Sequence, residues 1–431
     1  MVEVTQNIGR FEALALIAIL IVAGLALAAH LVRTSDCRKV ATAMVAAVIV
    51  DVAIRLTTYT INPRLLADEL FWHTLASAAA RYFRGESAMA TSSVEGKDGY
   101  VWVLGALYAA GGATPLLAIV LNIMAHVLLV GVAARSTRIL VDQSDLSAPV
   151  ASRTVAAAAY LTAILPSFTW WTPNVLRETI TLLLIASAVM LATKSLASGR
   201  AYPMVLAAGC LALLTWIRGT LGISVTLALM AALMFVWFGR SRYHALLRFV
   251  SLVLLVLIGM PIVVAITAFL DISADNIAIR TAELSETASS GFTGLGSSLD
   301  VGSIVRIIAP RVAFGPFPWE LTTSGVMLLA AVELACWLLV LFFAWRGIRL
   351  TKPRGILHGS RWLIPIYIVV AFAILFGLMF TVGNYGILAR FRPIPTIVLV
   401  PLAGLGFAWP FRTREGGGSS REPGFSSHRS N

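Results

Sequence analysis

Long apolar runs occupy most of this chain, and they limit the folds that it can adopt. A stretch of about 20 apolar residues is long enough to cross the hydrocarbon core of a bilayer as an α-helix. With tolerance for tilt and length, about eleven runs meet this criterion. They are 13–32, 40–54, 100–132, 154–171, 179–193, 203–217, 219–238, 249–270, 325–345, 362–382 and 393–409. The sequence therefore predicts an all-α integral membrane protein, a polytopic bundle of about 11 (about 10 to 13) transmembrane helices with two long non-cytoplasmic loops.

The composition agrees with this class, because 58% of the 431 residues are hydrophobic and only 13% are charged. The first run, 13–32, lacks a small-residue cleavage pattern and is expected to remain as the first helix. The run 100–132 is interrupted by glycines and a proline over 111–115. Either one crossing or two half-length helices fits that pattern.

The three cysteines, Cys37, Cys210 and Cys336, are isolated from one another. Their spacing indicates neither a disulfide framework nor a thiolate metal site. No motif identifies a cofactor, so the cofactor is unknown and the participation of a divalent cation is left open.

Basic residues give the expected topology. The chain carries 33 Lys and Arg against 21 Asp and Glu, a formal net charge of +12, and cytoplasmic loops are enriched in Lys and Arg. With the N-terminus outside and 100–132 crossing once, most basic residues fall in cytoplasmic loops. The charge then reflects topology, and no nucleic-acid partner is expected. Residues 1–411 form the transmembrane domain, with outer loops at 55–99 and 271–322, and 412–431 is a disordered cytoplasmic tail.

The first outer loop, 55–99, holds the candidate catalytic residues Asp68, Glu69 and His73, and it re-enters the membrane near Lys97. Neighbouring carboxylates and an imidazole among basic residues suit the deprotonation of a hydroxyl beside a phosphorylated donor. The alternative is a solvated loop that contains a short amphipathic helix.

Further charged residues stand at the ends of other runs, on the same predicted outer side. They are Arg177, Glu178, Arg218, Glu320, Arg390 and Arg392. A single arginine at a membrane boundary is usually explained by its charged head reaching water. Several on one face, together with carboxylates, favour a site for an anionic lipid head group, because guanidinium matches phosphate in geometry. Arg390 and Arg392 flank one residue and are expected to project to different sides of the chain.

Two carboxylates, Asp51 and Glu333, fall inside predicted spans. An ionisable residue within hydrocarbon is a functional candidate, either protonated or paired. Without a basic partner in a span and without an internal repeat, the two give little support to a proton-coupled transporter.

Several short motifs resemble those of polytopic GT-C glycosyltransferases and related bacterial polysaccharide-assembly membrane proteins. The motifs are Asp68-Glu69 with Trp72-His73 and an Ala-rich amphipathic helix over 75–83, Pro166-Ser167 with Trp170-Trp171 and Leu176-Arg177-Glu178, Gly315-Pro316-Phe317-Pro318-Trp319-Glu320, and Asn384-Tyr385-Gly386 with Leu388-Ala389-Arg390-Phe391-Arg392. The chain departs from that family in lacking a large soluble C-terminal domain and in carrying an extra span before the first outer loop.

The resemblance implies a sugar transfer from a polyprenyl-phosphate-linked donor to an envelope glycan, lipid or protein acceptor, on the non-cytoplasmic face of a bacterial inner membrane. Asp68 matches the family's catalytic base, with Glu69 beside it as a second candidate. Lys97, Arg390 and Arg392 are expected to contact the phosphate. The alternatives are an O-antigen or exopolysaccharide polymerase, which would use arginines and His73, a lipid-linked oligosaccharide flippase or transporter, and a scaffold subunit of an envelope complex.

Overall fold

The computed structural model describes residues 2–35, 38–61, 65–87, 98–144, 146–238, 306, 308–321, 325–350, 360–379 and 384–407. Nearly all of these residues are helical, and no strand occurs among them. Lys97, most of the predicted outer loop 271–322 and the predicted tail 412–431 lie outside the described residues.

Six helices of the described chain are long and apolar enough to cross a membrane, or seven if one bent pair forms a single span. The six are α1 (Val2–Ser35), α2 (Arg38–Ile61), α5 (Pro115–Asp142), α8 (Glu178–Ser198), α10 (Gly219–Phe238) and α15 (Gly325–Leu350). The bent pair is α17 (Tyr385–Phe391) with α18 (Pro393–Phe407), which meet at 40°. Two shorter apolar helices, α9 (Tyr202–Ile217) and α16 (Ile364–Leu378), coincide with predicted runs. The all-α membrane class is supported, whereas the described residues do not establish the predicted number of spans.

The interrupted run 100–132 forms two unequal helices, α4 (Asp98–Gly111) and α5. At the break, Gly112 has a φ of 82°, a left-handed conformation that glycine adopts without a steric penalty. Thr114 then caps α5 with its side chain, and a proline occupies the first turn, where the missing N–H costs nothing. Because α5 alone is long enough to span, the run gives one full-length helix and one short helix, not two half-length helices.

The predicted outer loop 55–99 is largely helical where it is described. Helix α2 continues to Ile61, and α3 (Ala67–Phe83) begins well before the helix that was expected over 75–83. Helix α3 packs on α4 at Gly105, where a Cβ would lie 2.6 Å from the Cβ of Ala79. Asp68 and Glu69 therefore lie in the first turn of a helix, where the helix dipole favours negative charge.

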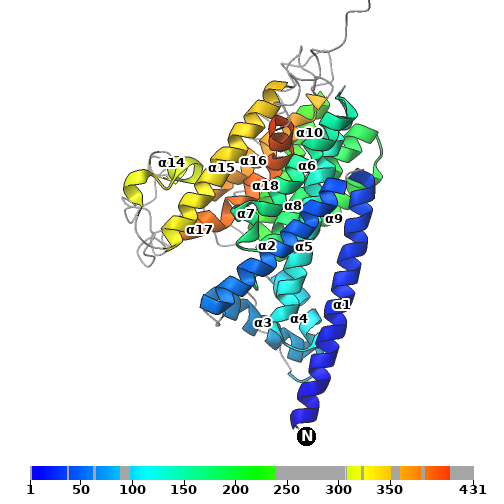
Figure 1. The fold of residues 1–431 in the computed structure, drawn as a ribbon, viewed down its shortest axis with the longest axis vertical. Helices are drawn as coiled ribbons and strands as arrows, with labels where there is room; N and C mark the ends of the chain where they lie inside the picture. The colour runs from blue at the N-terminus through cyan, green and yellow to red at the C-terminus, as the bar shows by residue number, and fades with distance from the viewer. Residues whose placement is uncertain are drawn as a thin grey trace, which may run out of the picture.

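The centre of the bundle is α5. In its most apolar window 78% of the residues are buried, against 11% in α1. Helices α15 and α18 approach each other closely, because a Cβ added at Gly347 or Gly406 would overlap a backbone carbonyl of the facing helix. Small residues of this kind let membrane helices pack where lipid offers no hydrophobic driving force. Figure 1 shows α15, α16 and α18 beside the central helices, with α3 and α4 near the lower half of α1.

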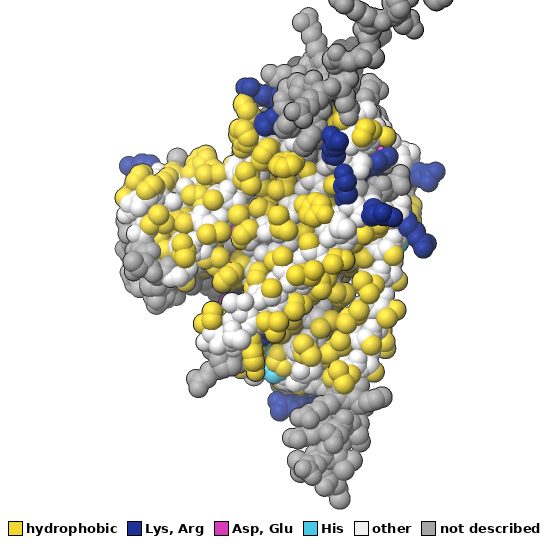
Figure 2. Space-filling view, viewed as in Figure 1, with side chains coloured by type: hydrophobic (Ala, Val, Ile, Leu, Met, Phe, Trp, Pro, Cys, Tyr) yellow, Lys and Arg dark blue, Asp and Glu magenta, His cyan; other side chains and the backbone are white. Residues whose placement is uncertain are grey.

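The remaining described helices are short or of intermediate length. They are α6 (Ala148–Ile164), α7 (Pro166–Thr169), α14 (Ala309–Phe314) and the 3-10 turn η2 (Pro318–Glu320). On the face drawn in Figure 2 hydrophobic side chains predominate, and most of the visible Lys and Arg lie at the upper end, away from α3 and α4. A large exposed apolar surface is what a membrane protein presents to lipid.

Candidate functional site

Five charged side chains from distant parts of the sequence meet where α3 and α8 begin. They are Asp68, Arg177, Glu178, Arg218 and Arg390, here named the charged cluster. Asp68 lies in the first turn of α3, the next two residues at the start of α8, Arg218 between α9 and α10, and Arg390 in α17. The sequence singled out each of the five, and the structure brings them together.

Arg390 contacts both carboxylates of the charged cluster. Its Nε donates to Oε1 of Glu178 at 2.8 Å, and its Nη1 forms an ion pair with Oδ2 of Asp68. Nη1 of Arg218 lies 3.9 Å from the same oxygen of Glu178. The Asp68 side chain is 63% exposed, whereas that of Glu178 is 4% exposed. One carboxylate therefore faces water while the other holds the arginines in the interior.

The two other arginines of the charged cluster are buried against aromatic rings. The guanidinium of Arg177 lies 4.9 Å from the ring centroid of Trp72, and that of Arg218 lies 4.2 Å from the ring centroid of Phe391. Both arrangements are cation–π contacts. Burial lowers the pKa of Arg177, and it lowers the pKa of Arg218 to about 9. Both guanidiniums still carry their charge at neutral pH.

The charged cluster has more positive than negative groups, since three guanidiniums face two carboxylates. Within the described chain, Nε of Arg177, Nη1 of Arg218 and Oε2 of Glu178 are buried without a hydrogen-bond partner. Buried charge-assisted donors without an acceptor are costly. Such donors beside an excess positive charge suit an anionic ligand such as a phosphate.

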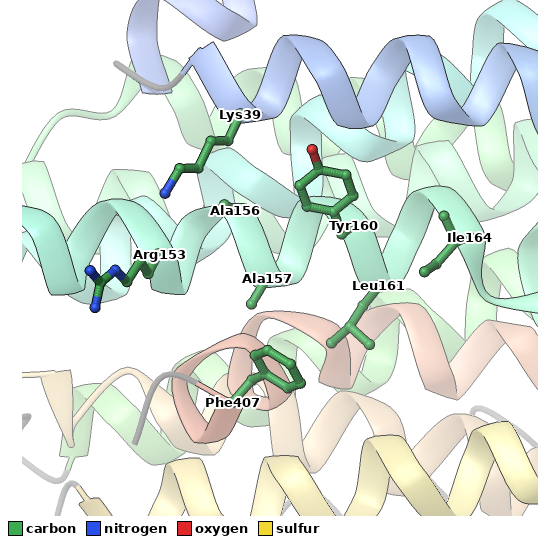
Figure 3. Close-up of a pocket in the computed structure, with 8 residues that line it drawn as sticks. All are labelled: Lys39, Arg153, Ala156, Ala157, Tyr160, Leu161, Ile164 and Phe407. Atoms are coloured by element: carbon green, nitrogen blue, oxygen red, sulfur yellow. The ribbon is translucent and has the colours of Figure 1, made fainter. Parts of the chain in front are cut away.

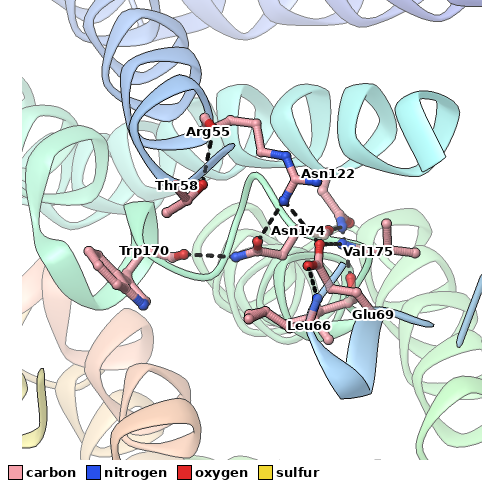
Figure 4. A network of polar contacts seen from close by, with 9 residues as sticks. Arg55, Thr58, Leu66, Glu69, Asn122, Trp170, Asn174 and Val175 are labelled. Carbon is pink, nitrogen blue, oxygen red and sulfur yellow. Dashed lines mark hydrogen bonds and ion pairs between the residues drawn. The ribbon is translucent and has the colours of Figure 1, made fainter. Parts of the chain in front are cut away.

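Glu69 stands next to Asp68 in sequence but has a different environment, which Figure 4 shows. Its Oε1 accepts from Nη1 of Arg55 at 3.1 Å and from the backbone N of Val175 at 3.0 Å, and its Oε2 accepts from the backbone N of Leu66 at 2.9 Å. The residue is 1% exposed. Oε1 thus holds α3 against the turn that leads into α8, and Oε2 caps the N-terminus of α3.

Asn122 of α5 completes this support. Its side-chain amide donates to the carbonyls of Asn174 at 2.6 Å and Leu176 at 2.8 Å (Figure 4). The side-chain oxygen of Asn174 in turn accepts from Arg55 at 3.2 Å. Because these bonds fix the backbone just before Arg177, the buried amide of Asn122 positions one edge of the charged cluster. No motif in the sequence points to Asn122.

His73 lies on another face of α3. Its Nδ1 is 3.0 Å from the hydroxyl oxygen of Tyr108, and burial lowers the pKa of the imidazole. Among the described residues no hydrogen bond joins His73 to Asp68, which is five residues earlier on the helix. The structure therefore groups His73 with α4 and not with the charged cluster.

Arg392 and Glu320 belong to a second group, around α14. Nη2 of Arg392 donates to the carbonyls of Arg311, Val312 and Gly315 at 3.2, 3.2 and 2.7 Å. Arg392 is completely buried. These carbonyls end α14, so the guanidinium acts there as a C-terminal cap.

Glu320 closes the same group. One of its oxygens pairs with the guanidinium of Arg311 at 2.6 Å, and the other accepts from the hydroxyl of Tyr385. Arg390 and Arg392 thus project to different sides of the chain, and only Arg390 reaches the charged cluster.

A polar pair is buried between three helices deeper in the bundle. Nδ1 of His126 lies 2.8 Å from Oδ2 of Asp51, and its Nε2 lies 2.9 Å from the carbonyl of Thr162. A carbonyl only accepts, so Nε2 carries the hydrogen of that bond, and the imidazole Nδ1 and the carboxyl share one proton. Asp51, predicted to be protonated or paired, is paired with a histidine that the sequence analysis did not consider.

Comparisons with protein-family models, with curated proteins and with solved structures found no match to this chain. No cluster of three or more His, Cys, Asp or Glu side chains that could hold a metal ion occurs among the residues searched, which are those the structure describes.

Proposed function

We propose that the chain is a membrane glycosyltransferase that moves a sugar from a polyprenyl-phosphate-linked donor to an envelope glycan, lipid or protein. The observation that supports this function is the charged cluster, in which one exposed carboxylate adjoins buried guanidiniums with unused donors. The proposal combines this chemistry with the motif resemblance described above.

The reaction requires both kinds of group. The acceptor oxygen forms a bond to the anomeric carbon, the bond from that carbon to the phosphate oxygen breaks, and the acceptor hydroxyl gives up its proton. Asp68 is the exposed carboxylate of the cluster and takes that proton. Arg390, Arg177 and Arg218 stabilise the negative charge that develops on the leaving phosphate.

The ion pair between Asp68 and Arg390 suggests how the base is controlled. The phosphodiester of the proposed donor carries one negative charge, as a carboxylate does, and it can accept two hydrogen bonds from one guanidinium. In this proposal the donor phosphate replaces Asp68 on Arg390, and Asp68 becomes free to accept a proton only when donor is bound. Glu178, which is buried, keeps Arg390 in place during the exchange.

The proposed orientation places the charged cluster on the non-cytoplasmic face of a bacterial inner membrane, because on the face drawn in Figure 2 most of the visible Lys and Arg lie at the end away from α3. Single cysteines introduced in a variant without the native cysteines test it. We expect Glu86→Cys to react with an impermeant maleimide in intact cells, and Arg200→Cys to react only after permeabilisation. The reverse labelling pattern would contradict the orientation.

A polymerase of lipid-linked repeat units is the second candidate. It is favoured by the observation that Arg390 pairs with both carboxylates of the charged cluster, so that catalysis by the arginines, which outnumber the carboxylates, needs no free base. It predicts that the polymer, not a single sugar addition, depends on the charged cluster.

Mass spectrometry of lipid-linked glycans in cells that lack the chain tests both candidates. A transferase leaves its polyprenyl-phosphate sugar and its unmodified acceptor to accumulate, whereas a polymerase leaves a diphosphate-linked repeat unit. Complementation with Asp68→Asn should fail at normal protein level. Asp142→Asn is the matched control, since Asp142 also pairs with an arginine at 2.7 Å, Arg138, but lies away from the charged cluster. Normal glycans with Asp68→Asn would refute Asp68 as the base.

A further inference from the structure

A groove of about 450 Å³ lies between α2, α6 and α18 (Figure 3). Its lining residues are Lys39, Arg153, Ala156, Ala157, Tyr160, Leu161, Ile164 and Phe407. Six of these come from α6 at positions separated by three or four residues around one helical face. Lys39 begins one wall at the start of α2, and Phe407 ends the other wall at the end of α18.

The groove is apolar along its length and basic at one end. In Figure 3 Lys39 and Arg153 lie at one end, Ile164 lies at the other, and Ala157 and Leu161 lie between them. The hydroxyl of Tyr160, which also lines the groove, is held by the side chain of Thr42 at 2.7 Å. None of the described residues that line the groove is acidic.

The dimensions match one leaflet of a bilayer. From Arg153 to Ile164 the α6 face is roughly 16 Å long at the rise of an α-helix, and half of the hydrocarbon core is about 15 Å. The two small residues Ala156 and Ala157 make the floor of the groove, while Ile164 and Phe407 remain exposed to the surroundings of the bundle. A volume of this size holds part of an acyl chain and not a whole lipid.

The basic end is far from the charged cluster. Lys39 is the second residue of α2, and Arg55, in the second half of the same helix, donates a hydrogen bond to Glu69. The sixteen-residue separation along α2 corresponds to roughly 24 Å. The groove is therefore a separate feature, and its chemistry does not depend on the proposed function.

From these observations we infer that the groove binds an anionic phospholipid of the adjacent leaflet. The phosphate lies between Lys39 and Arg153, and one acyl chain follows α6 between α2 and α18. Basic residues between transmembrane helices are a recurrent recognition element for anionic lipid head groups. The apolar floor supplies the binding surface for the chain, so a free head group is not a sufficient ligand.

Native mass spectrometry of the full-length protein, released from detergent with added lipid, tests the inference. The probes are dioleoyl phosphatidylglycerol, dioleoyl phosphatidylcholine and free glycerol phosphate. We expect retention of phosphatidylglycerol at least about tenfold above that of phosphatidylcholine, and no displacement by glycerol phosphate.

Two variants test the basic end and the apolar part of the groove separately. K39A/R153A removes the two basic side chains of the groove. Ala157→Trp keeps them and fills the apolar part of the groove. Either variant should lower phosphatidylglycerol retention about tenfold or more. The matched control K194A/R200A removes two basic residues near the junction of α8 and α9, outside the groove. Equal retention of the two lipids, displacement by glycerol phosphate, full retention by K39A/R153A, or an equal loss in the control would each overturn the inference. If Ala157→Trp loses phosphatidylglycerol retention while its size-exclusion profile matches that of the parent, the binding depends on the groove and not on surface charge alone.

Discussion

The buried pair of Asp51 and His126 is expected to contribute measurably to the stability of the folded protein. Both side chains are completely buried, 2.8 Å apart, and the imidazole also bonds the Thr162 carbonyl at 2.9 Å. We consider His126→Phe, Asp51→Leu and the double variant, which keep approximate size while removing the polar groups. The three helices α2, α5 and α6 meet at this point.

Removing the imidazole alone leaves a buried carboxyl without its partner, and we expect a cost of about 3–5 kcal/mol in the free energy of unfolding. Removing the carboxyl alone leaves one imidazole nitrogen unpaired while the bond to Thr162 persists, which costs about 1–3 kcal/mol. The double variant removes both the carboxyl and the imidazole, and it leaves the Thr162 carbonyl without its bond to the imidazole, as His126→Phe also does. It should therefore be less destabilised than His126→Phe, because apolar replacement of both partners of a buried pair is often close to neutral.

Unfolding by increasing sodium dodecyl sulfate in mixed micelles, followed by tryptophan fluorescence, measures the three changes. Hydrogen bonds between membrane helices couple by about 0.6 kcal/mol on average, so the coupling energy of this pair should exceed that value clearly. Asp51→Asn provides the control, because its amide can still donate to Nδ1 of the imidazole. Additive effects of the two single substitutions would show that the pair is not an energetic unit.

Three further predictions follow from the contacts. Arg390→Lys should lower the apparent affinity for a polyprenyl-phosphate sugar about tenfold or more, whereas Arg392→Lys should instead lower thermal stability. If both variants bound the donor as tightly as the parent, Arg390 would be a membrane anchor only. Gly406→Ala should reduce the yield of folded protein because its Cβ overlaps α15, while Gly209→Ala, with nothing within 4 Å of the added Cβ, should not; size-exclusion profiles compare them. Burial lowers the pKa of His73 below its usual 6.5, so the folded state binds a proton at this imidazole less readily than the unfolded chain. The contribution of the neutral imidazole to stability is therefore present above about pH 6.5 and is lost as the pH falls. Melting curves of His73→Gln, measured as a function of pH, should lack this loss of stability.

The sequence was sufficient for the class of the fold and for naming the five residues of the charged cluster. Apolar runs mark membrane helices without any tertiary information, and charges at the ends of such runs are expected to gather on a common face. Which carboxylate each arginine contacts was not predictable, because the arrangement of helices around α5 determines it. Glu178 shows this most clearly, since it pairs with Arg390 across more than two hundred positions.

The buried polar residues of α5 were missed although a signal was present. Asn122 and His126 are four residues apart, and so are Asp51 and Arg55 on α2. Polar residues at that spacing share one face of a helix, and two such faces in neighbouring apolar runs indicate a polar contact between the helices. The spacing leaves open which of several helices supply the partner, and the structure gives that answer through the bond of His126 to Asp51.

Asp68 and Glu69 illustrate why a local conformation decides the role of a side chain. In a flexible loop two adjacent carboxylates can serve the same site, and their adjacency in the sequence makes Glu69 a second candidate for the role of Asp68. In the first turn of α3 they point about 100° apart, which sends Glu69 into the interior and leaves Asp68 exposed. Since Glu69 holds the turn before Arg177, a substitution there acts on transfer through the position of the charged cluster, and it should change protein stability and activity together, whereas Asp68→Asn changes activity alone.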